Sequence, residues 1–143
     1  MRWLKRLFGK SKRKKSAEAV VAEFNSGMTA IRDAGSVNGA HYTDCVEEVK
    51  QLKREGKNQE AIEILLRSVE ASEAEAEFAG EGWGVAPWYY EQLAILYRKE
   101  KQYRDEVDVL KRYASLPKAP GVGPKKLADR LEKAKELSVK HGS

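Results

Sequence analysis

The chain has 143 residues, of which 34% are charged and 41% are hydrophobic, and its formal net charge at pH 7 is +5. This length suits one domain with a modest core, and no stretch approaches the roughly 18 apolar residues of a membrane span. The single cysteine, Cys45, excludes an internal disulfide and favours a cytoplasmic location. Apolar runs with a period of two are absent, which predicts an all-α fold without a sheet.

The charges are segregated along the chain. Residues 1–15 carry eight Lys or Arg and no acid, residues 16–82 have a net charge of −8, and residues 83–143 have a net charge of +5. Two basic ends therefore surround an acidic middle. This distribution differs from the uniformly basic surface of a protein that binds nucleic acid along its whole length.

Residues 1–15 combine apolar and basic side chains, and we interpret them as an arm that precedes a single helical domain at 16–143. The spacing of its apolar residues predicts one face of a short helix, and a basic run follows; the residues are Trp3, Leu4, Leu7 and Phe8, then Lys12, Arg13, Lys14 and Lys15. This pattern predicts reversible binding to an anionic membrane surface, at the inner membrane face. Two alternatives stay open: docking on the domain or on another copy, and nonspecific contact with nucleic acid. We expect no secretory signal, because the apolar segment is not continuous.

Apolar residues at helical spacing predict five to six helices in the rest of the chain. The spacing of Asp44 and Glu47 is that of a capping box and predicts a helix start near Asp44. The acidic stretch 70–78 is expected to expose most of its length. We interpret the carboxylates of residues 70–81 as a solvated face, because no His, Ser or basic partner accompanies them in a fixed pattern. Pro87 is expected in the first turn of a later helix.

Two segments of the chain are related to each other and resemble a tetratricopeptide repeat. The first carries a large residue, a glycine turn and then Ala and Leu, at Leu52, Gly56, Ala61 and Leu65; the second carries Leu93, Ala94, Tyr97, Tyr103 and Pro117. The resemblance covers about residues 42–117. It departs from the family pattern in three respects. Cys45 replaces the usual tryptophan, Gly56 is 45 residues before its counterpart Lys101 instead of the usual ~34, and the second segment has one extra residue between Tyr103 and Val107.

The resemblance implies stacked antiparallel helix hairpins at about 42–79 and 86–116, with capping helices at about 16–34 and 125–139. It also implies a non-enzymatic adaptor that binds a protein or peptide partner on a concave face. Trp83, Trp88 and Tyr89 are the candidate binding residues, because aromatic side chains dominate binding hot spots. The alternative is that these aromatics belong to the core.

The segment from Pro120 to Lys126 resembles the turn of helix-hairpin-helix DNA-binding motifs. In such a turn, Gly121 and Gly123 would let backbone N–H groups approach a phosphate, and Lys125 and Lys126 would add charge. This gives the alternative function, an accessory nucleic-acid-binding protein that uses the basic arm and this turn. A proline-rich linker before a capping helix explains the same residues.

No catalytic or metal site is predicted from the sequence. His41 and Cys45 have helical spacing, but two soft ligands without a second pair do not form a zinc site. The chain also lacks a phosphate loop, a nucleophile motif and a dinucleotide fingerprint. We therefore expect a non-enzyme without a cofactor or metal.

Overall fold

The computed structural model describes residues 16–37 and 40–142. The sequence-based predictions for Trp3, Leu4, Leu7 and Phe8, and for the basic residues Lys12 to Lys15, lie outside the described residues. They stay predictions.

The described residues form six α-helices, one 3-10 helix and one antiparallel pair of two-residue strands, which confirms the all-α fold class. The elements are α2 (Ala17–Ala34), β1 (Ser36–Val37), β2 (Ala40–His41), η1 (Tyr42–Cys45), α3 (Val46–Arg54), α4 (Asn58–Ala79), α5 (Pro87–Lys99), α6 (Tyr103–Ala114) and α7 (Gly123–His141).

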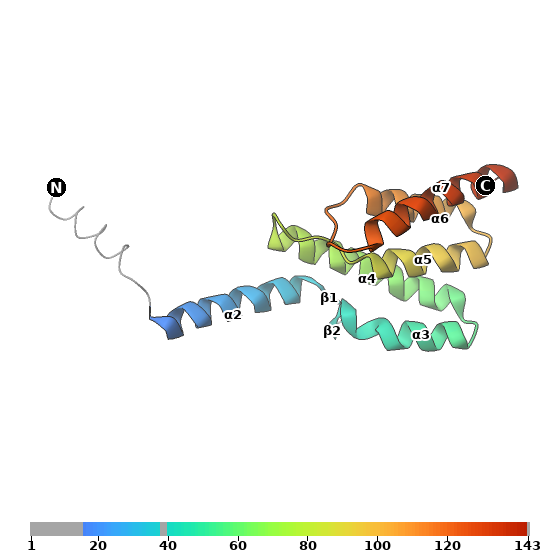
Figure 1. Cartoon of the computed structure of the whole chain (residues 1–143). Coiled ribbons are helices and arrows are strands. Elements are labelled where there is room, and N and C mark those ends of the chain that lie inside the picture. Colours follow the sequence, from blue (N-terminus) through green and yellow to red (C-terminus); the bar gives the residue numbers. More distant parts are fainter. Residues whose placement is uncertain (1–15, 38–39, 143) are drawn as a thin grey trace. The chain divides into compact units, whose positions relative to one another are not determined.

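From α3 to α7, each helix packs against the next one along the chain, in antiparallel fashion (Figure 1). Figure 1 also shows that the short turns after α3 and α5 lie at one end of this stack, and that the loops after α4 and α6 lie at the other. The core runs through the stack. Its largest fully buried apolar side chains are Tyr90, Tyr113, Leu65, Leu93, Leu96, Leu110 and Leu127.

The two short turns have the same backbone structure. Gly56 has a φ of 73° and Lys101 a φ of 59°, so both occupy the left-handed region. In each turn the N–H group one residue later donates to a carbonyl five residues back, Lys57 to Leu52 at 2.9 Å and Gln102 to Tyr97 at 2.8 Å. This is the Schellman pattern, which satisfies carbonyls at a helix end. The two hairpins therefore correspond with an offset of 45 residues, which places Glu106 at the position of Ala61.

Helix α2 belongs partly to a compact unit of its own, since residues 1–30 and 31–143 divide into separate units. The helix has no buried residue, and its apolar stripe of Val20, Val21, Phe24 and Met28 is exposed. Its predicted role as a capping helix stays a prediction.

Two local expectations were wrong. Asp44 does not cap α3; the helix follows Cys45, which makes no side-chain capping bond, and Asp44 lies inside η1. The cap of η1 is His41, whose side chain accepts a hydrogen bond from the Thr43 N–H. The acidic half of α4 is also not mainly exposed, because η1 and β1 pack against this helix. Its buried residues include Ala71, Ser72, Glu75 and Ala76.

Candidate interaction surface

A pocket of about 540 Å³ lies at the end of the stack where the loops after α4 and α6 meet. Trp83 from the first loop and Leu116 and Pro117 from the second form its apolar walls, together with Ala76 and Val85. Two glutamates of α4 and one of the first loop, with two glycines, complete the lining; they are Glu73, Glu77, Glu81, Gly80 and Gly82.

Glycines allow the two loops to approach each other. Val85 pairs with Lys118 as an isolated parallel bridge, in which the Val85 N–H donates to the Pro117 carbonyl at 2.9 Å. A Cβ atom at Gly84 would lie 2.2 Å from the carbonyl carbon of Lys118, so a larger residue cannot fit there without a backbone shift. Gly82 has a φ of 87°, a conformation that glycine adopts at low cost. The Trp83 side of the pocket therefore depends on these glycines.

Glu73 of α4 lines the pocket and also connects α4 to α5 and α6. Its carboxylate accepts hydrogen bonds from Arg112 of α6 through Nε at 2.7 Å and Nη2 at 2.6 Å, and from the Tyr90 hydroxyl of α5 at 2.9 Å. The bidentate geometry raises the pKa of the Arg112 guanidinium, and burial, followed by the charge of Glu73, raises the pKa of Tyr90. Three helices are thus tied together at one carboxylate.

Glu77 and Glu81 give the pocket an acidic rim. Both side chains are exposed, and neither forms an ion pair with the described part of the chain. Trp83 is half-buried, so part of its ring stays open to a ligand. The pocket can therefore take an apolar side chain, and its rim favours a ligand that carries positive charge beside that side chain.

The structure does not bring the three predicted aromatics into one site. Trp83 lines the pocket, whereas Trp88 does not. Tyr89 is only 4% exposed, because its ring packs edge-on between Tyr42 and Trp88, with centroid distances of 5.1 Å to each. The prediction of Tyr89 as a surface binding residue was wrong, since the broad apolar face of α5 is covered on this side by η1 residues. The candidate surface is therefore centred on Trp83.

The predicted phosphate-binding turn has a structural explanation. Gly123 begins α7, and a Cβ atom there would lie 2.4 Å from Cγ of Pro87, so the glycine lets α7 start close to α5. Lys125 pairs with Asp129 of its own helix at 2.8 Å, and Lys126 pairs with Glu91 of α5 at 3.1 Å. Gly121 has a φ of 135° and is exposed. The two lysines thus bind different acids on different helices.

A buried polar cluster on α4 corrects the expectation that the acids of 70–81 are solvated. Glu75 is 5% exposed; it contacts His41 Nε2 and accepts a hydrogen bond from the Tyr42 hydroxyl at 3.2 Å. The other ring nitrogen of His41 lies 2.7 Å from Thr43 Oγ1 and also faces the Thr43 N–H. Both nitrogens are therefore engaged, and the cluster ties α4 to β2 and η1. In the sequence, Ala71 and Ser72 indicate this cluster, because small residues one turn before Glu75 are typical of a helix face that packs closely against another element.

Comparisons with known proteins returned no matching family model, no matching curated protein and no matching solved structure. Among the described helices, none has both the length and the apolar character needed to cross a membrane. No group of three or more His, Cys, Asp or Glu in the described residues could hold a metal ion.

Proposed function

We propose that the chain is a non-enzymatic protein–protein interaction module of the adaptor type, and that its Trp83 pocket binds a peptide partner. The ligand has an apolar side chain flanked by Lys or Arg. The observation that carries this proposal is the pocket of about 540 Å³, in which a half-buried tryptophan stands between apolar walls and an acidic rim.

The geometry supports the proposal in two ways. Insertion of an apolar side chain against Trp83, Leu116 and Pro117 removes apolar surface from water, which contributes about 25 cal/mol per Å² before the costs of association. Glu77 and Glu81 then attract basic residues beside the inserted side chain, and this attraction sets orientation and association rate more than affinity. The stacked hairpins provide a rigid support for both.

A peptide-display selection against the full chain tests the proposal. We expect the selected peptides to share an apolar residue next to Lys or Arg. Trp83→Ala should weaken their binding about 30-fold or more, as expected for a hot-spot aromatic. Phe78→Ala is the matched control, because Phe78 is 60% exposed in the last turn of α4, just before the loop that carries Trp83, and does not line the pocket.

The charge component has its own test. Glu77→Gln and Glu81→Gln together should slow association and flatten its dependence on salt, while leaving the fold intact. If Trp83→Ala and Phe78→Ala weakened binding equally, or if the selected peptides carried no basic residues, the pocket would not be the binding site proposed.

Residues 1–15 support a finer proposal, a tether to the inner membrane face. Its basis is the sequence pattern of Trp3, Leu4, Leu7 and Phe8 beside a basic run. Sedimentation with anionic liposomes should then require Trp3 and Phe8.

The alternative function, accessory nucleic-acid binding, uses the same basic arm with Gly121 to Lys126. It predicts DNA or RNA affinity that falls steeply with salt and is lost when residues 1–15 are removed.

A further inference from the structure

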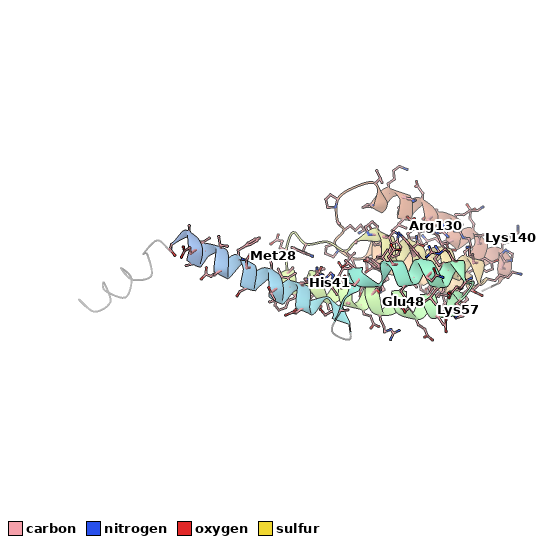
Figure 2. The ribbon with its side chains drawn as sticks, turned by 90° about the horizontal axis from the view of Figure 1, so that it is seen from below. Met28, His41, Glu48, Lys57, Arg130 and Lys140 are labelled. Atoms are coloured by element: carbon pink, nitrogen blue, oxygen red, sulfur yellow. The ribbon has the colours of Figure 1, made fainter. Side chains whose placement is uncertain are left out.

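A second pocket, lined mainly by basic residues, lies between α5 and α7. It has a volume of about 390 Å³, and four of its six lining side chains are cationic: Arg98 from α5, and Lys126, Arg130 and Lys133 from α7. The other two are Glu91 and Ile95. Figure 2 labels Arg130 on α7. This pocket is separate from the Trp83 pocket and is independent of the function proposed above.

A buried carboxylate holds the two arginines in place. Glu106 of α6 is 0% exposed, and its Oε2 lies 2.9 Å from Nη2 of Arg98 and 2.9 Å from Nη2 of Arg130. Arg98 Nε also donates to Glu106 Oε1 at 2.9 Å. The corresponding position of the first hairpin is Ala61, which needs no partner. Two cations therefore share one anion, and the cluster has a net charge of +1.

Three buried polar atoms of this cluster make no hydrogen bond within the described residues: Nη2 of Arg98, Oε2 of Glu106 and Nε of Arg130. Of these, only Arg130 Nε also takes no part in the ion pairs with Glu106. Burial lowers the pKa of the Arg130 guanidinium, partly opposed by the charge of Glu106. A buried donor without a partner costs free energy, because it has given up its hydrogen bond to water. The fold therefore retains a cation in a state that an added anion would stabilise.

The two lysines extend the positive charge to the mouth of the pocket. Lys126 pairs with Glu91, and Lys133 pairs with Glu136 at 3.4 Å; both lysine side chains are more than half exposed. Pairs of this kind are weak in water and can be replaced by a stronger anion. An anion in the pocket would thus meet two guanidinium groups that Glu106 holds in place, and the ammonium groups of two exposed lysines.

We infer that this pocket binds the phosphate group of a phosphate monoester. A monoester carries a charge of about −1.5 to −2 at pH 7 and has three terminal oxygens, so it can accept hydrogen bonds from several of these donors at once. A carboxylate has one charge and two oxygens. The volume of about 390 Å³ leaves room for the group that bears the phosphate, either a small molecule or a phosphorylated side chain of a peptide.

The test is an NMR titration of the full chain with inorganic phosphate, free phosphoserine and a phosphoserine peptide, against sodium chloride at matched ionic strength and against acetate. We expect saturable shifts of the Arg98 and Arg130 Nε–H signals with phosphate compounds and not with chloride. Tighter binding of the peptide would identify a peptide as the source of the phosphate. Equal or tighter binding of free phosphoserine would identify a small molecule.

Paired variants distinguish a built site from a general basic surface. Lys126→Ala with Lys133→Ala removes two charges from the pocket and should weaken phosphate binding about tenfold or more. The control, Lys125→Ala with Lys135→Ala, removes two charges from the same helix outside the pocket and should change the affinity less than about twofold.

Three results would overturn the inference. They are the absence of saturable shifts with every phosphate compound, acetate binding as tight as phosphate binding, and an equal loss of affinity in the two double variants. None of these results bears on the Trp83 pocket, so the two proposals fail independently.

Discussion

Lys101 adopts a backbone conformation that glycine provides in the equivalent turn. Its φ of 59° lies in the left-handed region, which costs a residue with a Cβ atom about 1 kcal/mol or more. Lys101→Gly removes this cost, partly offset by the greater freedom of glycine in the unfolded chain. We expect the free energy of unfolding to rise by about 0.5–1 kcal/mol, as measured by urea denaturation.

Gly56→Ala is the reciprocal test, because Gly56 has a φ of 73° in the same Schellman turn. This change should lower the free energy of unfolding by about 1 kcal/mol. A Lys101→Gly variant that is no more stable than the parent would show that the two turns are not energetically equivalent.

The partners of buried charged residues are the feature that the sequence predicts least well. Glu106 lies on the apolar stripe of α6 between Tyr103 and Leu110, so its burial could have been inferred from the helical period. Its partners could not, because Arg130 comes from a different helix and periodicity contains no information about long-range pairing. The same holds for Glu75 and His41, which meet across distant elements. Trp83, by contrast, was predicted as a candidate, and the structure places it in the pocket.

The helices themselves were largely predictable, since each has apolar residues at helical spacing and most are bounded by glycine or proline. Their starts were less so: α3 begins at Val46 after a 3-10 turn, and α7 begins at Gly123, two residues earlier than expected. The capping spacing at Asp44 does not predict the first residue of α3, because the 3-10 turn before this helix packs on α4. The conformation of loops depends even more on such tertiary contacts: the loop after α4 is held by the bridge between Val85 and Lys118.

Gly84 controls how closely the loops after α4 and α6 approach each other. Gly84→Ala places a Cβ atom 2.2 Å from the Lys118 backbone, so the Val85–Lys118 bridge must open. We expect a loss of about 2 kcal/mol or more in the free energy of unfolding, together with weaker peptide binding at Trp83. Urea denaturation and the display-selected peptides measure the two effects.

Gly82→Ala separates steric overlap from backbone strain. Gly82 has a φ of 87°, but a Cβ atom there would meet nothing within 4 Å. Its substitution should therefore cost only the left-handed penalty of about 1–2 kcal/mol. If Gly84→Ala were tolerated better than Gly82→Ala, the close approach of the two loops would not be required for stability.

For the molecule as a whole, the fold class followed from composition and helical period, whereas the arrangement of the two pockets did not. The negative middle of the chain contributes Glu73, Glu77 and Glu81 to one pocket, and the positive C-terminal part contributes Lys126 and Arg130 to another. The charges that are separate in the sequence are also separate in space, because the loop after α4 and the α5–α7 interface lie in different parts of the stack. It could be seen only after the helices were packed.

The tyrosine-rich core predicts how the whole molecule responds to alkaline pH. Burial is the largest cause of a raised pKa at five tyrosines, so each holds its proton more tightly in the folded chain than in the unfolded chain; they are Tyr42, Tyr89, Tyr90, Tyr97 and Tyr113. The unfolded chain loses these protons first, near pH 10. The contribution of these tyrosines to the free energy of unfolding is therefore fully present below about pH 10 and is lost as the pH rises above it.

Urea denaturation at a series of pH values, with tyrosinate absorbance as a second signal, measures this effect. Tyr113→Phe is the informative variant, because the Tyr113 hydroxyl is buried and has no hydrogen-bond partner among the described residues. Its removal should leave stability at neutral pH unchanged or slightly higher, since no bond is lost. Above about pH 10 it should make the decline shallower, because one tyrosine no longer contributes to the linkage. An identical decline in the variant and the parent would mean that tyrosine ionisation does not drive alkaline unfolding.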